Sequence, residues 1–240
     1  MGTAYGVTGC DAQLDFSDTA KITFGTGTLV ADLNDSSGSG VGAVQGTATN
    51  QPDRNATKNG LAATTFDGVD NYMSLDSTIS VPDAGNYFFF VVKMSGTGSR
   101  SIIGGTNGAD LQIRVDGSGN LNVLRYDTED CGSSSGASMD DAAWHVCSVY
   151  VSTTERRFRI DSTARGTVTV TTGGSFTKWS KLGSKEGSTE WGSIVLGEVL
   201  HFGSDIGTTN RDTIEAALVA KWLLRRAPAA PVWRRSLNLT

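Results

Sequence analysis

The alternation of apolar and polar positions predicts short β-strands along most of the chain. Residues 12–33 place apolar side chains at nearly every second position, which is typical of two or three half-buried strands. Residues Tyr87–Val92 form an unbroken apolar run of strand length. Such a run is expected of a central strand that is covered on both faces.

Several further strands are expected in antiparallel pairs. Leu111–Val115 and Leu121–Leu124 flank the glycine-rich turn Asp116–Asn120, which predicts a hairpin. Trp144–Val151 and Arg157–Ile160 predict a second pair. The other expected strands are Thr167–Thr171 and Ile194–Phe202, with a polar loop over 127–141 and an extended, glycine-broken loop over 172–193.

One helix is expected near the C-terminus. Apolar residues recur at helical spacing between Ile214 and Trp222, and Thr209 with Asp212 approximates a capping box. After Leu224 the composition changes to a proline- and arginine-containing stretch that disfavours helix. We therefore expect an N-terminal segment over 1–11, one domain over 12–224 and a basic Pro/Arg tail over 225–240.

Composition supports a single soluble all-β domain. The chain has 240 residues, with 30 glycines and only 4 prolines, which suits many turns between short strands. No run approaches the ~20 apolar residues that span a bilayer, so no membrane association is expected. The first residues have neither a basic start nor an apolar stretch, so no signal peptide is expected.

Charge is distributed unevenly along the chain. The net charge is −5, and an acidic body argues against nucleic-acid binding, because phosphate contacts need a basic surface. The tail carries no acid, and its arginines and tryptophan are residue types enriched at protein interfaces. We expect the tail to bind a neighbouring subunit through Arg225, Arg226, Trp233, Arg234 and Arg235.

The three cysteines lack the spacing of a zinc site or of a disulfide framework. Cys147 lies in an apolar strand and is expected to be a buried free thiol. Cys10 and Cys131 fall in glycine-rich segments, where two free thiols and a single bridge remain as alternatives.

Several phrases of the sequence occur in an order typical of one family. Asn59–Leu75 reads as two short strands around an Asp67-Gly68 turn, and Asn34–Gly40 is a polar turn cluster. Together with Trp144–Val146 and the segment from Gly197 to Trp222, they resemble the laminin-G-like branch of the concanavalin A-like jelly rolls, over roughly residues 12–224. The resemblance implies an all-β fold, a two-sheet antiparallel jelly-roll sandwich with one short C-terminal helix.

The same resemblance suggests a role. Single laminin-G-like domains rich in Ser, Thr and Gly resemble the capsid-decoration or host-surface-binding modules of tailed-phage virions. It implies a non-enzymatic virion structural protein that forms homo-oligomers, contacts other capsid proteins and binds host-surface glycans. The alternative is a soluble carbohydrate-binding lectin or adhesin module that acts without a particle.

No enzymatic site is predicted. Glycosidases need two carboxylates flanking the scissile bond, and on a strand this requires acids at alternating positions. No Glu-x-Asp-x-Glu pattern occurs in the chain. His145 and His201 lie in apolar strands without a Gly-x-Ser-x-Gly motif beside them, so both are expected to be structural.

Two tryptophans are the candidates for binding a sugar. Trp179 and Trp191 lie in the expected loop 172–193 and could stack on sugar rings, with packing beneath the loop as the alternative. Trp144 and Trp222 are expected to be structural.

Calcium is the one cofactor for which the sequence contains candidate ligands. Asp67, Asp70 and Asn71 supply oxygen ligands close together, as do Asp116 and Asn120. These residue types equally form turns by accepting hydrogen bonds from nearby amides. Since no motif specific to calcium is present, no cofactor is predicted.

Overall fold

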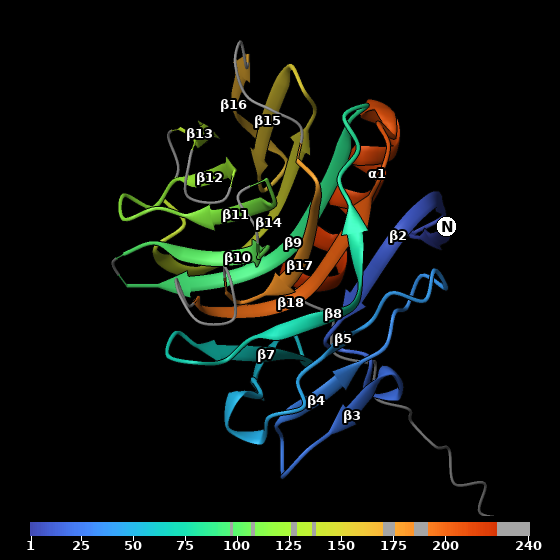
Figure 1. Cartoon of the computed structure of the whole chain (residues 1–240), viewed down its shortest axis with the longest axis vertical. Helices are drawn as coiled ribbons and strands as arrows, with labels where there is room; N and C mark the ends of the chain where they lie inside the picture. The colour runs from blue at the N-terminus through green and yellow to red at the C-terminus, as the bar shows by residue number, and fades with distance from the viewer. Residues whose placement is uncertain are drawn as a thin grey trace, which may run out of the picture.

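The chain folds as a two-sheet β-sandwich (Figure 1). The computed structural model describes residues 1–96, 98–106, 109–125, 129–135, 138–169, 176–184 and 192–224. All strand pairs in these ranges are antiparallel, and helix α1 (Gly207–Leu218) follows the last strand. The predicted fold class is therefore confirmed. No helix in the described ranges is long and apolar enough to span a membrane.

The first sheet contains nine of the described strands. Its longest strands lie at the centre, and β6 and β7 join it along one half of β18. The order is β1 (Gly2–Ala4), β2 (Val7–Asp15), β18 (Ser193–Phe202), β9 (Asn86–Ser95), β14 (Asp141–Val151), β15 (Glu155–Ile160) and β16 (Thr163–Thr169), with β6 (Asp53–Lys58) paired to β7 (Leu61–Asp67).

The second sheet also contains nine of the described strands, several of them short. Its order is β13 (Glu129–Ser133), β12 (Leu121–Arg125), β11 (Leu111–Val115), β10 (Arg100–Gly104), β17 (Lys178–Leu182), β8 (Met73–Ser80), β5 (Ala43–Val44), β4 (Val30–Leu33) and β3 (Ile22–Phe24).

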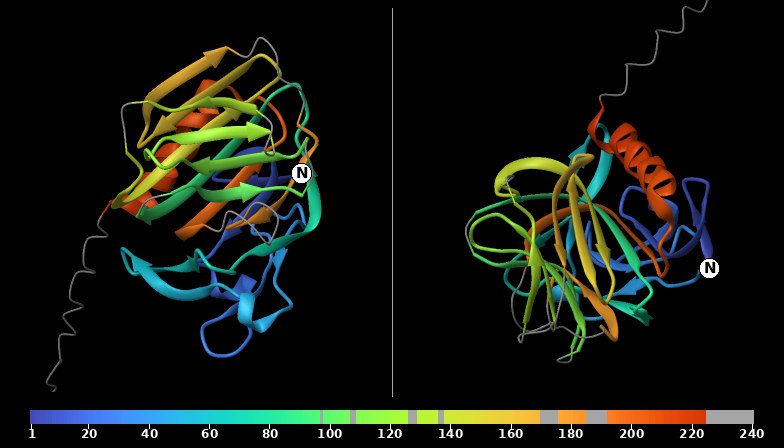
Figure 2. Two further views of the ribbon diagram at one scale, coloured as in Figure 1. Left: turned by 60° about the vertical axis from the view of Figure 1, so that its left-hand side comes forward. Right: turned by 90° about the horizontal axis from the view of Figure 1, so that it is seen from above.

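Strand β9 lies at the centre of the core, as its apolar sequence predicts. Phe88, Phe90 and Val92 face the second sheet, whereas Tyr87 and Phe89 face the opposite way, towards helix α1. Because strand side chains alternate between faces, one uninterrupted apolar run fills two layers of the core. Figure 2 shows α1 outside the strands, on the side away from β10–β12.

Helix α1 is held to the first sheet by apolar packing and by a buried acid. Ile214, Leu218 and Trp222 pack against the sheet at four-residue spacing, and Trp144 stacks on Trp222 at 5.9 Å. Glu215 is buried on the same face, where it accepts hydrogen bonds from Ser148 (2.6 Å) and Arg159 (2.9 Å). The chain then continues into one π-helical turn, Val219–Leu223.

A second buried acid, Glu198, joins the two ends of the described chain. Its carboxylate, on β18, is fully buried. It accepts hydrogen bonds from Tyr5 (2.8 Å) and Gln13 (2.8 Å) near the N-terminus and from Lys221 (2.7 Å) and Trp222 (3.0 Å) after α1. A buried carboxylate is tolerated only when it is paired in this way. The contacts therefore fix the first hairpin and the helix to the same strand.

The expectation of a loop over 172–193 was wrong, because strand β17 lies within this range and runs between β10 and β8. Its register with β8 shifts between Trp179 and Lys181, so Trp179 and Leu182 both enter the core although they are three residues apart. A bulge of this kind breaks the alternation on which strand prediction depends. The expected loop 127–141 likewise contains the polar edge strand β13.

The two strands expected around Asp67-Gly68 are present as β7 and β8, which belong to different sheets. Two local expectations also need correction. Helix α1 starts at Gly207 without a side-chain cap, so Thr209 and Asp212 form no capping box. Residues 1–11, which the sequence analysis set apart, contribute to β1 and β2 of the first sheet.

Replacing Glu198 tests whether this carboxylate holds the two chain ends together. Glu198→Ala should lower the free energy of unfolding by about 3–5 kcal/mol, because Lys221 and the Tyr5 hydroxyl lose a buried partner. Urea denaturation measures the change. Glu155→Ala, which removes a half-buried acid that pairs with Arg157, is the control and should cost under about 1 kcal/mol. Equal losses in the two variants would show that Glu198 is not a structural centre.

Candidate functional site

The loop from Asn34 to Gly42 is built around the side chain of Asp35. Gly38 and Gly40 take positive φ angles of 87° and 88°, which lets the chain turn back over this carboxylate. Asp35 is buried, and its oxygens accept hydrogen bonds from the backbone amides of Gln13 (2.8 Å), Ser37 (3.2 Å), Ser39 (2.7 Å) and Gly40 (3.1 Å).

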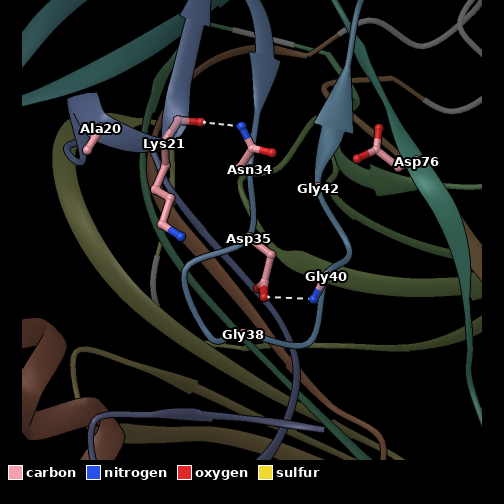
Figure 3. Close-up of a pocket in the computed structure, with 8 residues that line it drawn as sticks. All are labelled: Ala20, Lys21, Asn34, Asp35, Gly38, Gly40, Gly42 and Asp76. Atoms are coloured by element: carbon pink, nitrogen blue, oxygen red, sulfur yellow. Dashed lines mark hydrogen bonds between the residues drawn. The ribbon is translucent and has the colours of Figure 1, made fainter.

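These amides keep Asp35 ionised. Burial by itself would raise the pKa of the carboxyl, but the hydrogen bonds from Gln13, Gly40 and Ser37 bring the pKa below its ordinary value. The loop is thus fixed by a charged acceptor that also joins it to strand β2. Figure 3 shows the Asp35 carboxylate turned towards Gly40 inside the loop.

An open pocket of about 360 Å³ lies beside this loop. Strand β5 is only two residues long, so β8 beyond Asp76 has no strand neighbour on the side of the loop. Lys21, Asn34 and Asp76 enter the pocket from three separate segments, with Asp76 across from Asn34 (Figure 3). We call this the Asp76 pocket.

Three polar groups of the Asp76 pocket remain available to a ligand. The Asn34 amide nitrogen donates to the Lys21 carbonyl (3.2 Å), which leaves the Asn34 side-chain oxygen unused. The Lys21 ammonium and the Asp76 carboxylate make no hydrogen bond or ion pair with the described residues. The pocket therefore offers two acceptors and one charged donor.

Gly42 is required by the position of Asp76. A Cβ at residue 42 would lie 2.6 Å from Asp76 Oδ2 and 2.8 Å from the Leu33 carbonyl oxygen. Nearby Asp32 has a raised pKa, first because it is partly buried and second because Asp76 is negative. Asp32 and Asp76 thus concentrate negative charge on this side of the pocket. They do not form a metal site, since no group of three His, Cys, Asp or Glu residues that could hold a metal ion occurs in the described part of the chain.

Trp179 is not at this site, and the expectation that it lies outside the regular strands was wrong. It is fully buried on β17, where its ring packs on Phe88 (6.0 Å) and His201 (6.1 Å) between the sheets. No face of the ring is open to a sugar, because the bulge in β17 turns Trp179 inward.

The other candidate residues lie outside the described residues. These are Trp191 and the tail residues Arg225, Arg226, Trp233, Arg234 and Arg235. Their assignments stay predictions.

The two histidines have structural partners, as expected. His145 contacts Asp161 (2.8 Å) and Asp141 (3.1 Å), and its pKa is raised, first by the hydrogen bond to Asp161. His201 is fully buried, which lowers its pKa, and it contacts Asn86 at 3.3 Å.

Two of the residues considered for calcium, Asp67 and Asp116, accept hydrogen bonds within turns. Asp67 accepts from the amides of Val69 (2.9 Å) and Asn71 (3.3 Å), and Asp116 accepts from Ser118 (2.8 Å) and Asn120 (3.0 Å). The alternative interpretation of these residues as turn formers is confirmed.

The cysteines are partly placed. Cys147 is free and buried, as predicted, and Cys10 is also free and buried. Cys10 lies in β2 rather than in a loop. The side chain of Cys131 is outside the described part of the structure.

Sequence reasoning missed the Asp76 pocket, although it identified one wall of it. The Asn34–Gly40 cluster was recognised as a turn, but Lys21 and Asp76 carried no motif. They meet only because β3, β4, β5 and β8 are neighbours in the second sheet.

Comparison with known proteins shows a shared fold. No family model matches the sequence, and no curated protein sequence matches it. Among solved structures, a sialidase of Trypanosoma rangeli is similar with a TM-score of 0.58 and 12% identity, over 92% of this chain and 34% of that one.

Two botulinum neurotoxin structures are also similar. The serotype G binding domain has a TM-score of 0.63 at 10% identity, and the type C structure has 0.61 at 11% identity. Each match covers 88% of this chain and 51% of the other. The chain thus spans a third to a half of these neighbours, and at such identities the likeness shows the fold alone, a β-sandwich.

Replacing Asp35 tests whether its carboxylate holds the loop. Asp35→Asn should lower the free energy of unfolding by about 3 kcal/mol at pH 7, because the new amide group faces backbone N–H donors. Asp35 has a lowered pKa when folded, so its contribution is present above pH ~3.9 and disappears as pH falls through the lowered pKa.

The difference between the two proteins should therefore shrink below about pH 4. Denaturation curves measured from pH 7 down to pH 3 test this dependence. Asp70→Asn, which removes a charge from another loop, is the control. A loss for Asp35→Asn that is independent of pH would argue that the ionised carboxylate is not what fixes the loop.

Proposed function

We propose that the chain is a glycan-binding module and that sugar hydroxyls bind in the Asp76 pocket. The observation that carries this proposal is the set of three unused polar groups, Lys21, Asn34 and Asp76, around one open pocket. A volume of about 360 Å³ falls in the range of roughly 300–1,000 Å³ that is usual for small-molecule sites.

The chemistry of the pocket suits a hydroxyl-rich ligand. Each sugar hydroxyl both donates and accepts a hydrogen bond, so a site for it needs acceptors and donors together. Asp76 and Asn34 accept, and the Lys21 ammonium donates. Asp35 holds the loop in one conformation before a ligand binds, which reduces the conformational entropy that the loop loses on binding.

The structural neighbours support this proposal by analogy. Cell entry of botulinum neurotoxin type C depends on interaction with two ganglioside molecules, and the Trypanosoma rangeli protein is a sialidase. A fold alone does not determine a function, and the main support for glycan binding is therefore the chemistry of the Asp76 pocket. We propose a binding role without catalysis, because the sequence has no Glu-x-Asp-x-Glu pattern that would place paired acids on one strand.

Glycan binding can be tested with variants of the pocket. Asp76→Ala and Asn34→Ala should each weaken binding of an array-selected glycan by about tenfold, because each removes a hydrogen-bond acceptor. Isothermal calorimetry measures affinity, and melting temperatures should not change, since both side chains are exposed. Asp70→Asn is the matched control for charge.

The same glycans should release no reducing ends on incubation with the protein. Turnover that disappears in Asp76→Ala or Asp32→Ala would replace the binding role with a hydrolytic one. The absence of binding to any glycan on the array, or an affinity that is unchanged in both pocket variants, would count against the site.

The virion role expected from the sequence is carried by the resemblance and by the tail. It remains our proposal for where such a module acts, and the tail provides its test. Deleting residues 225–240 should leave the sandwich folded, because the last described contacts precede the cut: Asn59 donates to the Trp222 (2.6 Å) and Leu224 (2.7 Å) carbonyls.

The deletion should abolish self-association, which sedimentation velocity measures. Circular dichroism serves as the control for folding. If the truncated protein assembles as the full chain does, the tail has no role in self-association, and the main support for attachment to a particle is lost.

A further inference from the structure

A second open pocket lies on the other side of the Asn34–Gly42 loop. Its volume is about 380 Å³. Gly38, Gly40 and Gly42 line the Asp76 pocket, whereas the intervening Ser39 and Val41 line the second one. We call the second hollow the Asp11 pocket, after the acid in its wall.

The walls of the Asp11 pocket combine hydroxyls with an apolar surface. Thr78 and Ser80 of β8 are exposed and make no side-chain hydrogen bond with the described residues. Val41, which is half-buried, and Pro82, which is exposed, supply apolar surface beside them. A pyranose ring has polar hydroxyl groups at its edge and an apolar C–H surface on its face. The pocket can bind both, because its own hydroxyls donate and accept hydrogen bonds beside an apolar wall.

Asp11 is fixed in position from behind. Its Oδ2 atom accepts a hydrogen bond from the Gly203 amide (2.8 Å) and lies 3.4 Å from His201 Nδ1. Its other oxygen, Oδ1, accepts no hydrogen bond within the described residues. One oxygen therefore orients the carboxylate, and the other remains free for a ligand.

His201 completes a buried chain of polar groups behind Asp11. The Asn86 amide nitrogen donates to the Pro82 carbonyl (2.6 Å), so the Asn86 oxygen faces His201 Nε2 at 3.3 Å. Nε2 therefore donates to Asn86, and Nδ1 makes no hydrogen bond within the described residues. Trp179 packs against this histidine, with ring centroids 6.1 Å apart.

The glycine at 203 is specific to this arrangement. A Cβ there would lie 2.5 Å from Asp11 Oδ2 and 3.7 Å from His201 Cε1, so any other residue would displace the carboxylate. Burial by itself would raise the pKa of Asp11, but His201, the Gly203 amide and the positive charge of the first amino group lower it. The carboxylate is consequently ionised at neutral pH.

We propose that the Asp11 pocket is a second sugar subsite that binds a neutral pyranose, with Asp11 Oδ1 accepting its hydroxyls and Val41 and Pro82 contacting its ring carbons. This inference rests on the proposed glycan-binding function. An ionised carboxylate repels a second carboxylate, so the subsite disfavours acidic sugars such as sialic acid. Charge-assisted hydrogen bonds from hydroxyls to a carboxylate are stronger than neutral ones.

Amide shifts in two-dimensional NMR distinguish the two pockets. The probes are methyl glycosides of neutral hexoses and the methyl glycoside of N-acetylneuraminic acid, titrated into the full chain. The neutral glycosides should shift the Gly203 and Ser80 amides of the Asp11 pocket, and the acidic glycoside should not. The Gly40 and Gly42 amides report separately on the Asp76 pocket.

Two variants test the role of Asp11 and of the pocket. Asp11→Asn preserves an acceptor for the Gly203 amide and should weaken neutral-sugar binding at Gly203 by about tenfold. Thr78→Trp fills the pocket from an exposed position and should abolish the shifts. Asp70→Asn and Thr167→Trp, the latter on the edge strand β16, are the matched controls.

The outcomes separate this inference from the proposed function. Shifts confined to Gly40 and Gly42, and unaffected by Asp11→Asn and Thr78→Trp, would overturn the second subsite while the glycan-binding function stands. Equal binding of the acidic glycoside at Gly203 would overturn the neutral specificity. If no glycoside shifts either set of amides, the proposed function itself fails.

Discussion

The cost of burying a carboxylate is the constraint on which this structure depends most. Glu198 is fully buried, and an acid in that position must be surrounded by donors or leave the folded state unstable. Its donors are Tyr5 and Gln13 from the start of the chain and Lys221 and Trp222 from the end. One electrostatic requirement thus brings together segments about 200 residues apart, next to the apolar packing of Trp222 on the first sheet.

The same constraint shapes the candidate site. Asp35 is surrounded by backbone amides, and collecting them forces the Asn34–Gly42 chain into a compact loop. Asp11 is oriented by the Gly203 amide. In both cases a structural carboxylate prepares the geometry, while other atoms, at Asp76 and at Asp11 Oδ1, remain free for a ligand. The short strand β5 leaves room for the pockets on either side of the loop.

Much of the fold could be predicted from the sequence, because periodicity reports burial directly. The continuous apolar run of β9 and the glycine-rich hairpin of β11 and β12 were both recognised. Strand β17 was missed because its bulge interrupts the alternation, and this error also placed Trp179 on the surface instead of in the core.

The site was far less predictable than the fold, because its residues come from segments distant in sequence. Lys21, Asn34 and Asp76 carry no shared motif, and their proximity follows from the strand order of the second sheet. Asp11 and Gly203 are likewise far apart along the chain and meet because β2 pairs with β18. Only the Asn34–Gly40 cluster gave a local signal, and that signal indicated a turn rather than a ligand site.

A crystal structure of the chain bound to a glycan that it recognises in solution would locate the sugar site. We expect an ordered sugar beside the Asn34–Gly42 loop, with hydroxyls within hydrogen-bonding distance of Asp76 and Asn34. An ordered sugar elsewhere on the sandwich, with both sides of this loop empty, would contradict this expectation.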